Sequence, residues 1–318
     1  MMTDTTIERV NNSAGPEFGI HPPGDRLPNA TQIGRVRLQV ADLGRSITFY
    51  ERVLGLSVTS VGPGEALATP RASAETLIEL VERPGASPAP PRGRLGLFHF
   101  AILLPDRAAL GRLIPHLSAA GVHVAGSDHL VSEALYLSDP DGLGIEVYAD
   151  RPRAGWQARD GELVMSTLPL DFDDVISAAG GERFDGMPAG TRLGHVHLHV
   201  GDIDRAAAFY HEALGFDKVV WSHPHALFLS AGGYHHHLGV NTWAGPRATP
   251  PADGEAQLLE WELLLPTDAT VAGVRTSLET AGHEVEAHSD GLLARDPWGT
   301  RLRIRARSLT TSGATRNA

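Results

Sequence analysis

The feature that most restricts the fold of this chain is an internal repeat. Residues 34–56 recur as residues 194–216, with 10 identities in 23 aligned positions at an offset of 160. Each copy begins with alternating apolar residues, a pattern typical of a strand. An Asp then opens a helix, at Asp42 or Asp202, and a glycine ends it, at Gly55 or Gly215. The chain therefore contains one structural unit at least twice.

A second, weaker pair of repeats extends this organisation. Residues 98–106 resemble 259–267, residues 139–148 resemble 296–305, and a helix ending at Ala-Gly lies between them in each copy. This predicts an α+β fold with four βαβββ motifs, at about 33–82, 95–150, 192–242 and 257–307, forming two domains. The expected boundaries are an N-terminal arm 1–32, a first domain 33–150, a connector 151–191, a second domain 192–307 and a tail 308–318.

The composition restricts the class of protein. With 318 residues, 42% hydrophobic and 20% charged, the chain suits two globular domains. A net charge of −11 argues against nucleic acid or an anionic membrane as a partner. The absence of cysteine excludes disulfides, zinc–thiolate sites and thiol nucleophiles. Because no apolar run is long enough for a membrane span and no signal pattern is present, a cytoplasmic protein is expected.

Histidines are numerous and clustered. Nine of the sixteen lie between His195 and His237, and clustered imidazoles commonly form metal or acid–base sites. His195, His197 and His199 alternate, so their side chains are expected on one face of a strand. His99 lies in an apolar strand, where burying an unpaired imidazole is costly. Surface or core histidines without a function are the alternative interpretation.

The repeated motifs resemble a known superfamily. Their opening strand and helix with Phe-Tyr and Leu-Gly, and their closing Asp-Pro-Asp-Gly strand, are similar to those of the vicinal-oxygen-chelate proteins. That superfamily includes glyoxalase I, fosfomycin-resistance proteins and extradiol dioxygenases. Within it, HFAILLPD, SEALYLSDPDG, EVYADRPR and GYHHHLGVNTW resemble the bacterial catechol-2,3-dioxygenases of the CatE type.

The resemblance implies a metal site between facing motifs. The matching positions are Arg35, His99, His195 and Glu260 in first strands, with Glu146 and Arg303 in closing strands. His99, His195 and Glu146 would bind the metal, as a two-histidine, one-carboxylate set suited to Fe(II), with Mn(II) as an alternative. This set implies that the second motif faces the third and the first faces the fourth. Arginine has no lone pair to donate, so the first and fourth motifs, with Glu79 nearby, should hold ion pairs instead, and Arg35 and Arg303 are expected close to Glu260.

The resemblance also implies a reaction and its residues. His236 would act as acid and base, Tyr136 would hydrogen-bond the substrate, and His129 or Asp128 would add a further contact. His235 and His237 are expected to point away from His236, and a solvated loop is the alternative for all three. His197, His199 and Asn241 are expected to line the substrate pocket.

The expected activity is extradiol cleavage, with O2, of a small catechol-type or hydroquinone-type aromatic diol. The alternatives are a glyoxalase-like lyase or isomerase that uses the same metal, and a resistance protein that binds an aromatic or a drug. Resistance proteins of that kind lack metal ligands, so the candidate ligand set argues against the last alternative. A homo-oligomer is compatible with the sequence.

Overall fold

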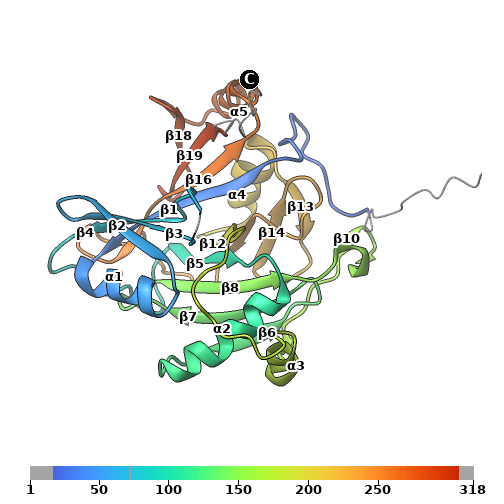
Figure 1. Cartoon of the computed structure of the whole chain (residues 1–318). Coiled ribbons are helices and arrows are strands. Elements are labelled where there is room, and N and C mark those ends of the chain that lie inside the picture. Colours follow the sequence, from blue (N-terminus) through green and yellow to red (C-terminus); the bar gives the residue numbers. More distant parts are fainter. Residues whose placement is uncertain (1–16, 72, 308–318) are drawn as a thin grey trace, which may run out of the picture.

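The structure is a computed structural model that describes residues 17–71 and 73–307 (Figure 1). The tail 308–318 and the first half of the N-terminal arm lie outside the described residues. The rest of the arm packs on the third motif, where Arg26 pairs with Asp217 at 2.5 Å and Leu27 is buried. Within the described ranges, no helix is both long and apolar enough to cross a membrane.

Four βαβββ motifs follow one another along the chain, as predicted. The first contains β1 (Gln32–Val40), α1 (Leu43–Arg52), β2 (Ser57–Gly62), β3 (Glu65–Thr69) and β4 (Ile78–Glu82). The second contains β5 (Gly96–Leu103), α2 (Arg107–Ala119), β6 (Ala125–Asp128), β7 (Ser132–Ser138) and β8 (Gly144–Asp150). The third contains β12 (Arg192–His199), α4 (Ile203–Ala207), a π-helical turn η2 (Ala208–Ala213), β13 (Asp217–Val220), β14 (Ala226–Ser230) and β15 (Leu238–Asn241). The fourth contains β16 (Gln257–Leu265), α5 (Asp268–Thr280), β17 (Val285–His288), β18 (Gly291–Arg295) and β19 (Arg301–Ala306).

The connector between the second and third motifs has short elements of its own. These are η1 (Arg153–Gly155), β9 (Ala158–Arg159), β10 (Glu162–Leu163), β11 (Leu168–Pro169) and α3 (Phe172–Ser177). Strand β11 adds to the edge of β6, with Leu168 opposite Asp128. This pairing holds the preceding residues of the connector close to the second motif.

The strands form two large sheets, and each sheet combines one motif from each half of the chain. The eight-stranded sheet has the order β17-β18-β19-β16-β1-β4-β3-β2, and the nine-stranded sheet has the order β11-β6-β7-β8-β5-β12-β15-β14-β13. Antiparallel pairs join the motifs, β1 with β16 and β5 with β12. The expected pairing of first with fourth motif and second with third is confirmed. Each sheet contains strands from both halves of the chain, so the sheets do not mark where one half ends and the other begins. The domain boundaries along the chain therefore stay a prediction.

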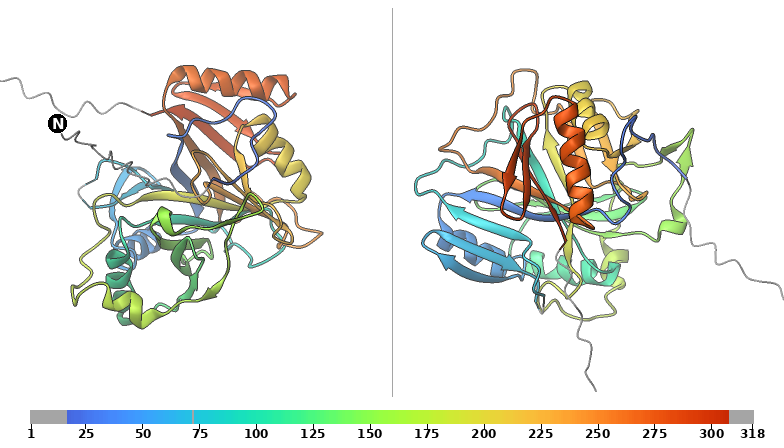
Figure 2. Two further views of the ribbon diagram at one scale, coloured as in Figure 1. Left: turned by 90° about the vertical axis from the view of Figure 1, so that its right-hand side faces the viewer. Right: turned by 90° about the horizontal axis from the view of Figure 1, so that it is seen from above.

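The repeat explains much of the core. The alternating residues of the first strands are buried, with Val36 and Val196 both 0% exposed. Helices α2 and α5 lie at opposite ends of the molecule, on the outside of the sheets (Figures 1 and 2). Burying the apolar faces of strands and helices against each other is the main source of stability in such a layered fold.

The repeated Phe-Tyr pair links neighbouring motifs. The hydroxyl of Tyr50 donates to Asp139 Oδ2 at 3.2 Å, and that of Tyr210 donates to Asp296 Oδ2 at 3.0 Å. Both tyrosines are fully buried, so their hydroxyls need such partners. The same contact therefore connects a helix of one motif to the Asp-Pro turn of the next motif, once in each half of the chain.

Candidate metal centre and substrate cavity

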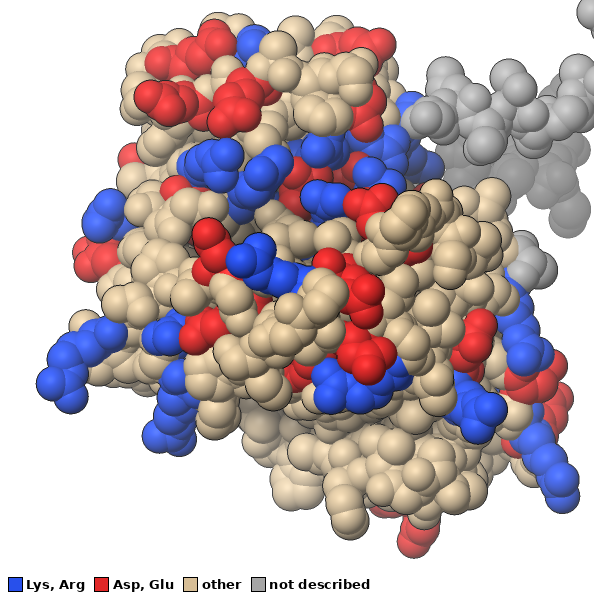
Figure 3. Space-filling view, turned by 90° about the vertical axis from the view of Figure 1, so that its left-hand side faces the viewer, with Lys and Arg blue, Asp and Glu red and all other residues tan. Residues whose placement is uncertain are grey.

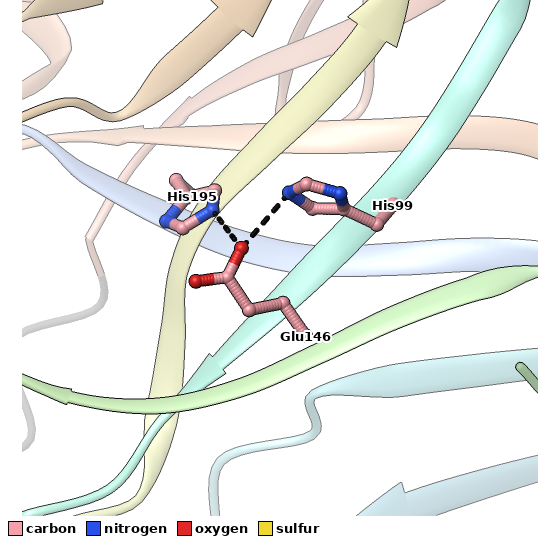
Figure 4. Close-up of side chains that lie close together, drawn as sticks. All are labelled: His99, Glu146 and His195. Carbon is pink, nitrogen blue, oxygen red and sulfur yellow. Dashed lines mark hydrogen bonds and ion pairs between the residues drawn. The ribbon is translucent and has the colours of Figure 1, made fainter. Parts of the chain in front are cut away.

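Three adjacent strands bring His99, His195 and Glu146 together. His99 lies on β5, His195 on the antiparallel neighbour β12, and Glu146 on β8, which runs parallel to β5 on its other side. Nε2 of His99 and Nε2 of His195 each lie 3.0 Å from Oε2 of Glu146 (Figure 4). One potential ligand atom from each residue lies within 4.8 Å of the others, and all three side chains are buried.

This donor set fits a divalent metal ion. Two imidazole nitrogens converge on one carboxylate oxygen, yet the buried Nε2 of His99, although 3.0 Å from that oxygen, is not oriented to form a hydrogen bond with it. An unsatisfied buried nitrogen is costly, and a coordinated cation would satisfy it. The two-histidine, one-carboxylate set is the one that mononuclear Fe(II) enzymes use, and it leaves positions open for other ligands.

The electrostatics favour the protonation states that a metal requires. Burial lowers the pKa of His195 to about 4, although Glu146 opposes this shift. Burial alone would raise the pKa of Glu146, but His195 and His99 hold it well below its usual range. At neutral pH His195 is therefore neutral and Glu146 ionised, the forms that donate lone pairs to a metal.

A cavity of about 490 Å³ opens beside the three residues. It is lined by Phe98, His99, Ser127, His129, Tyr136, Glu146, Met165, Ser166, Thr167, His197, Val220, His223, Phe228, His236 and Trp243. Mostly apolar walls with a few converging polar groups are typical of a small-molecule site. A cavity of this size can hold one substituted aromatic ring.

His129 and Tyr136 form a pair at the wall of this cavity. His129 Nδ1 lies 2.7 Å from the carbonyl of Ser166, and Nε2 lies 2.8 Å from the Tyr136 hydroxyl. Because a carbonyl only accepts, His129 carries its proton on Nδ1, and in its neutral form Nε2 accepts from Tyr136. Burial raises the pKa of Tyr136 well above its usual value, and Glu146 adds to the shift. Asp128, the alternative to His129, instead pairs with Arg151 at 2.8 Å.

His236 also lines the cavity and lies against the metal candidates. Its ring centroid is 4.0 Å from that of His195, and the ring of Phe228 is nearly perpendicular to it, with the two centroids 5.1 Å apart. Burial lowers the pKa of His236 well below its usual value, and the neighbouring His195 adds to the shift. The side chain is therefore neutral at physiological pH.

The loop that carries His236 is buried, so the solvated-loop alternative is wrong. His235, His236 and His237 are 0%, 5% and 4% exposed. His237 turns away, as expected, and its Nδ1 accepts from the Ala231 amide at 3.2 Å. The same expectation for His235 is wrong, because its Nδ1 lies 2.7 Å from Nδ1 of His236. The three histidines follow two glycines with positive φ and lie before β15, so they are not part of an extended strand. Neighbouring side chains therefore need not point to opposite sides, as they would in a strand.

The three residues expected in the substrate pocket have different positions. His197 lines the cavity, whereas His199 lines an adjacent cavity of about 630 Å³. Asn241 is fully buried behind these two histidines. Its Nδ2 lies 3.0 Å from His197 Nε2, and its Oδ1 lies 2.7 Å from His199 Nδ1. Asn241 therefore orients two histidines instead of facing the 490 Å³ cavity.

Two glycines make room for this arrangement. A Cβ on Gly194 would lie 1.7 Å from the Tyr148 hydroxyl, and one on Gly239 would lie 2.9 Å from the His197 ring. Both distances are below any normal contact, so larger residues would displace these side chains. Small residues next to His195 and opposite His197 are therefore required by packing.

Sequence reasoning missed the aromatic walls and the connector. Phe98, Phe228 and Trp243 surround the cavity, and Met165 to Thr167 cover one side of it. Phe98 directly precedes the segment HFAILLPD, and Trp243 ends the segment GYHHHLGVNTW. Their positions beside candidate site residues could therefore have indicated that they line the cavity. The connector residues carry no motif, and the pairing of β11 with β6 and the hydrogen bonds between Ser166 and His129 place them at the site.

The first and fourth motifs hold ion pairs at the equivalent positions. Arg303 forms two hydrogen bonds with Glu260, at 2.6 and 3.1 Å, as predicted. Arg35 was expected beside the same glutamate, but its side chain pairs with Glu79 at 3.5 Å. Arg37 is the residue opposite Glu260 in the strand pairing. On the face shown in Figure 3, basic and acidic side chains stand beside one another and do not form separate patches.

Paired βαβββ motifs arranged in this way define the vicinal-oxygen-chelate class of fold. The family model described as Glyoxalase/Bleomycin resistance protein/Dioxygenase superfamily matches residues 32–147 and 192–304. The chain therefore belongs to this superfamily.

Individual relatives agree with that assignment. A curated protein of Bacillus subtilis (strain 168), named catechol-2,3-dioxygenase, is 44% identical over 269 residues, which cover 84% of this chain and 94% of that protein. The solved structure of a Bacillus subtilis protein proposed to be a dioxygenase has a TM-score of 0.60 at 13% identity, covering 89% and 86% of the two chains. Glyoxalase I from Zea mays has a TM-score of 0.52 at 16% identity, covering 87% and 92%. At these identities the two structures show a shared fold.

Proposed function

We propose that this protein is an extradiol ring-cleaving dioxygenase that uses Fe(II) and O2 on a catechol-type or hydroquinone-type aromatic diol. The carrying observation is the convergence of His99, His195 and Glu146 beside a cavity with aromatic walls and a neutral histidine, His236. The relative named catechol-2,3-dioxygenase supports the choice of substrate class.

Fe(II), when bound by His99, His195 and Glu146, would supply open positions for an aromatic diol and O2 and would exchange electrons with both. Mn(II) suits the same donor set. The other residues of the cavity would bind the ring and move protons. Phe98, Phe228 and Trp243 would pack on the ring and exclude water.

Proton transfer would fall to His236. A neutral imidazole can accept a proton from a phenolic oxygen, and the imidazolium so formed can return it later in the reaction. Tyr136 donates its own proton to His129, so its oxygen keeps lone pairs that can accept a hydrogen bond from a substrate hydroxyl. Because burial keeps Tyr136 protonated, it would orient the substrate without adding negative charge.

The proposal is tested by oxygen uptake. The protein should be loaded anaerobically with Fe(II) or Mn(II) and then mixed with air-saturated buffer and a series of catechols and hydroquinones. We expect O2 consumption matched by a coloured ring-fission product. A glyoxalase-like lyase or isomerase would convert its substrate without taking up oxygen. A binding protein would neither convert the substrate nor take up oxygen. Either result would contradict the proposal. His123→Ala, at an exposed histidine that does not line the cavity, is a matched control.

A further inference from the structure

His235 is a fully buried histidine with no role in the reaction described above. It is 0% exposed and lies between His236 and Asp150. Its Nδ1 is 2.7 Å from Nδ1 of His236, and its Nε2 is 2.9 Å from Oδ1 of Asp150. A buried imidazole with partners at both nitrogens has a fixed orientation, because turning the ring would leave buried polar atoms without partners.

The direction of these two hydrogen bonds follows from the chemistry of the groups. A carboxylate oxygen only accepts, so Nε2 of His235 carries a proton and donates it to Asp150. In the neutral imidazole, Nδ1 of His235 then has a lone pair. With His235 neutral, two lone pairs would face each other at 2.7 Å unless Nδ1 of His236 carries the proton between them. The remaining nitrogen of His236, Nε2, is left with a lone pair.

Asp150 is itself held in place. The Tyr234 hydroxyl donates to Asp150 Oδ1 at 3.1 Å, and the Tyr148 hydroxyl lies 2.7 Å from that of Tyr234. The ring of Tyr234 also packs on His235, with centroids 4.1 Å apart. The carboxylate and His235 are thus fixed relative to each other by contacts that do not involve His236.

We propose that Asp150 and His235 are positioning residues that fix His236 in the tautomer with its proton on Nδ1, so that Nε2 is the nitrogen available to the substrate. This inference rests on the proposed function in one respect, namely that His236 exchanges a proton with an aromatic diol. The tautomer itself depends only on the hydrogen bonds of the protein. A carboxylate that orients a reacting histidine through its second nitrogen is a common arrangement, and here His235 extends it by one residue.

The direct test is nitrogen NMR of protein labelled with ¹⁵N-histidine, without metal. In the native chain we expect His236 to show a protonated Nδ1 and an unprotonated Nε2, with its signals assigned by their loss in His236→Asn. A proton on Nε2 of His236 in the native chain overturns the inference, whether or not the protein cleaves any catechol. Absence of ring cleavage with the expected tautomer would instead count against the proposed function alone.

Variants test the role of each residue. In Asp150→Asn the new amide can donate to His235 and reverse both hydrogen bonds, so the proton of His236 should move to Nε2. With Fe(II) bound, kcat should fall by about 10–100-fold while KM and iron content stay unchanged. Tyr234→Phe, which removes one hydrogen bond to Asp150 but leaves its carboxylate in place, is the matched control and should keep the native tautomer. An unchanged tautomer and kcat in Asp150→Asn would overturn the role of Asp150.

A double variant separates positioning from general damage to the fold. His235→Asn keeps an oxygen acceptor near the position of Nδ1, so it should retain the proton on His236 Nδ1 and most of kcat, whereas His235→Leu should lose both. In the His235→Asn background, Asp150 no longer has a histidine to orient. Adding Asp150→Asn to His235→Asn should therefore lower kcat only slightly. An equal loss of kcat in the native and the His235→Asn backgrounds would show that Asp150 acts only through the fold.

Discussion

Arg303 occupies in β19 the position that Glu146 occupies in β8. Arg303 lies opposite Glu262 of β16, two residues after Glu260, just as Glu146 lies opposite Ala101 of β5, two residues after His99. The repeat therefore offers two equivalent sets of positions, of which one holds the proposed metal ligands and the other an arginine–glutamate pair. In the second set the guanidinium of Arg303 supplies the positive charge next to the carboxylate, the place that the proposed metal would take in the first set.

Removing that guanidinium should destabilise the fold without affecting the metal. The side chains of Arg303 and Glu260 are 10% and 8% exposed, so Arg303→Met leaves a largely buried carboxylate, with Arg301 near it at 3.4 Å. A loss of about 3 kcal/mol in the free energy of unfolding is expected, as is usual when one partner of a buried pair is removed. Urea unfolding measures this loss, and metal content should stay constant.

The double variant Glu260→Gln with Arg303→Met is the control for that prediction. Without the negative charge no buried carboxylate is left unpaired, so much of the lost stability should return. A double variant that is less stable than Arg303→Met would show that the charges themselves are not the cause.

Metal binding is predicted to depend on each of the three ligands. The native protein should bind about one divalent ion per chain, and His99→Ala or Glu146→Gln should remove most of it, because a three-residue site loses much of its affinity with one ligand. Elemental analysis after dialysis measures occupancy, with His123→Ala as the exposed control. Near-full occupancy in either ligand variant would contradict this assignment of ligands.

The sequence predicted the elements better than their surroundings. Alternation and the repeat predicted the four motifs, and alignment of the repeats placed His99, His195 and Glu146 at equivalent ends of their strands. The motifs follow from local periodicity, which a single sequence displays directly, whereas the ligand positions are what the resemblance to the vicinal-oxygen-chelate proteins implies. Met165 reaches the aromatic walls through the short pairing of β11 with β6 and the hydrogen bonds between Ser166 and His129, and no local pattern in the sequence predicts these contacts.

The errors at single residues have a common cause. Asn241 and His235 were assigned from their neighbours in the sequence, but side-chain direction there depends on hydrogen bonds to distant residues. Asn241 is turned to His197 and His199, and His235 is turned to Asp150, 85 residues away. Such polar networks are fixed by tertiary structure, so periodicity alone cannot predict them.

The buried histidines should make the metal-free protein unstable in acid. Burial, together with Arg192, lowers the pKa of His237 to about 3 from its usual 6.5. Below pH 6.5 the unfolded chain takes up a proton that the folded chain refuses, so stability falls as pH falls, by about 1.4 kcal/mol per pH unit for each such histidine. The loss continues down to about pH 3, where the folded His237 also becomes protonated.

One variant isolates the contribution of His237 to this pH dependence. His237→Asn keeps an acceptor for the Ala231 amide but cannot take up a proton. Between pH 6 and 4.5, its free energy of unfolding should fall less steeply than that of the native protein, by about 1.4 kcal/mol per pH unit. Parallel curves for the two proteins in urea titrations would show that His237 does not titrate on unfolding.

The reaction itself depends on His236, and one variant distinguishes the roles considered for it. If His236 is the acid and base, His236→Ala should keep iron content and substrate affinity while lowering turnover by about 10²–10⁴-fold, the usual contribution of general acid–base catalysis. If it were a fourth metal ligand, as a glyoxalase-like site would require, the same change should weaken metal retention. His223→Ala, at another histidine that lines the cavity, controls for the loss of an imidazole from its wall. His236 is assigned as acid and base because it is neutral and packs on His195. Unchanged turnover in His236→Ala would therefore remove the main reason for assigning ring cleavage to this cavity.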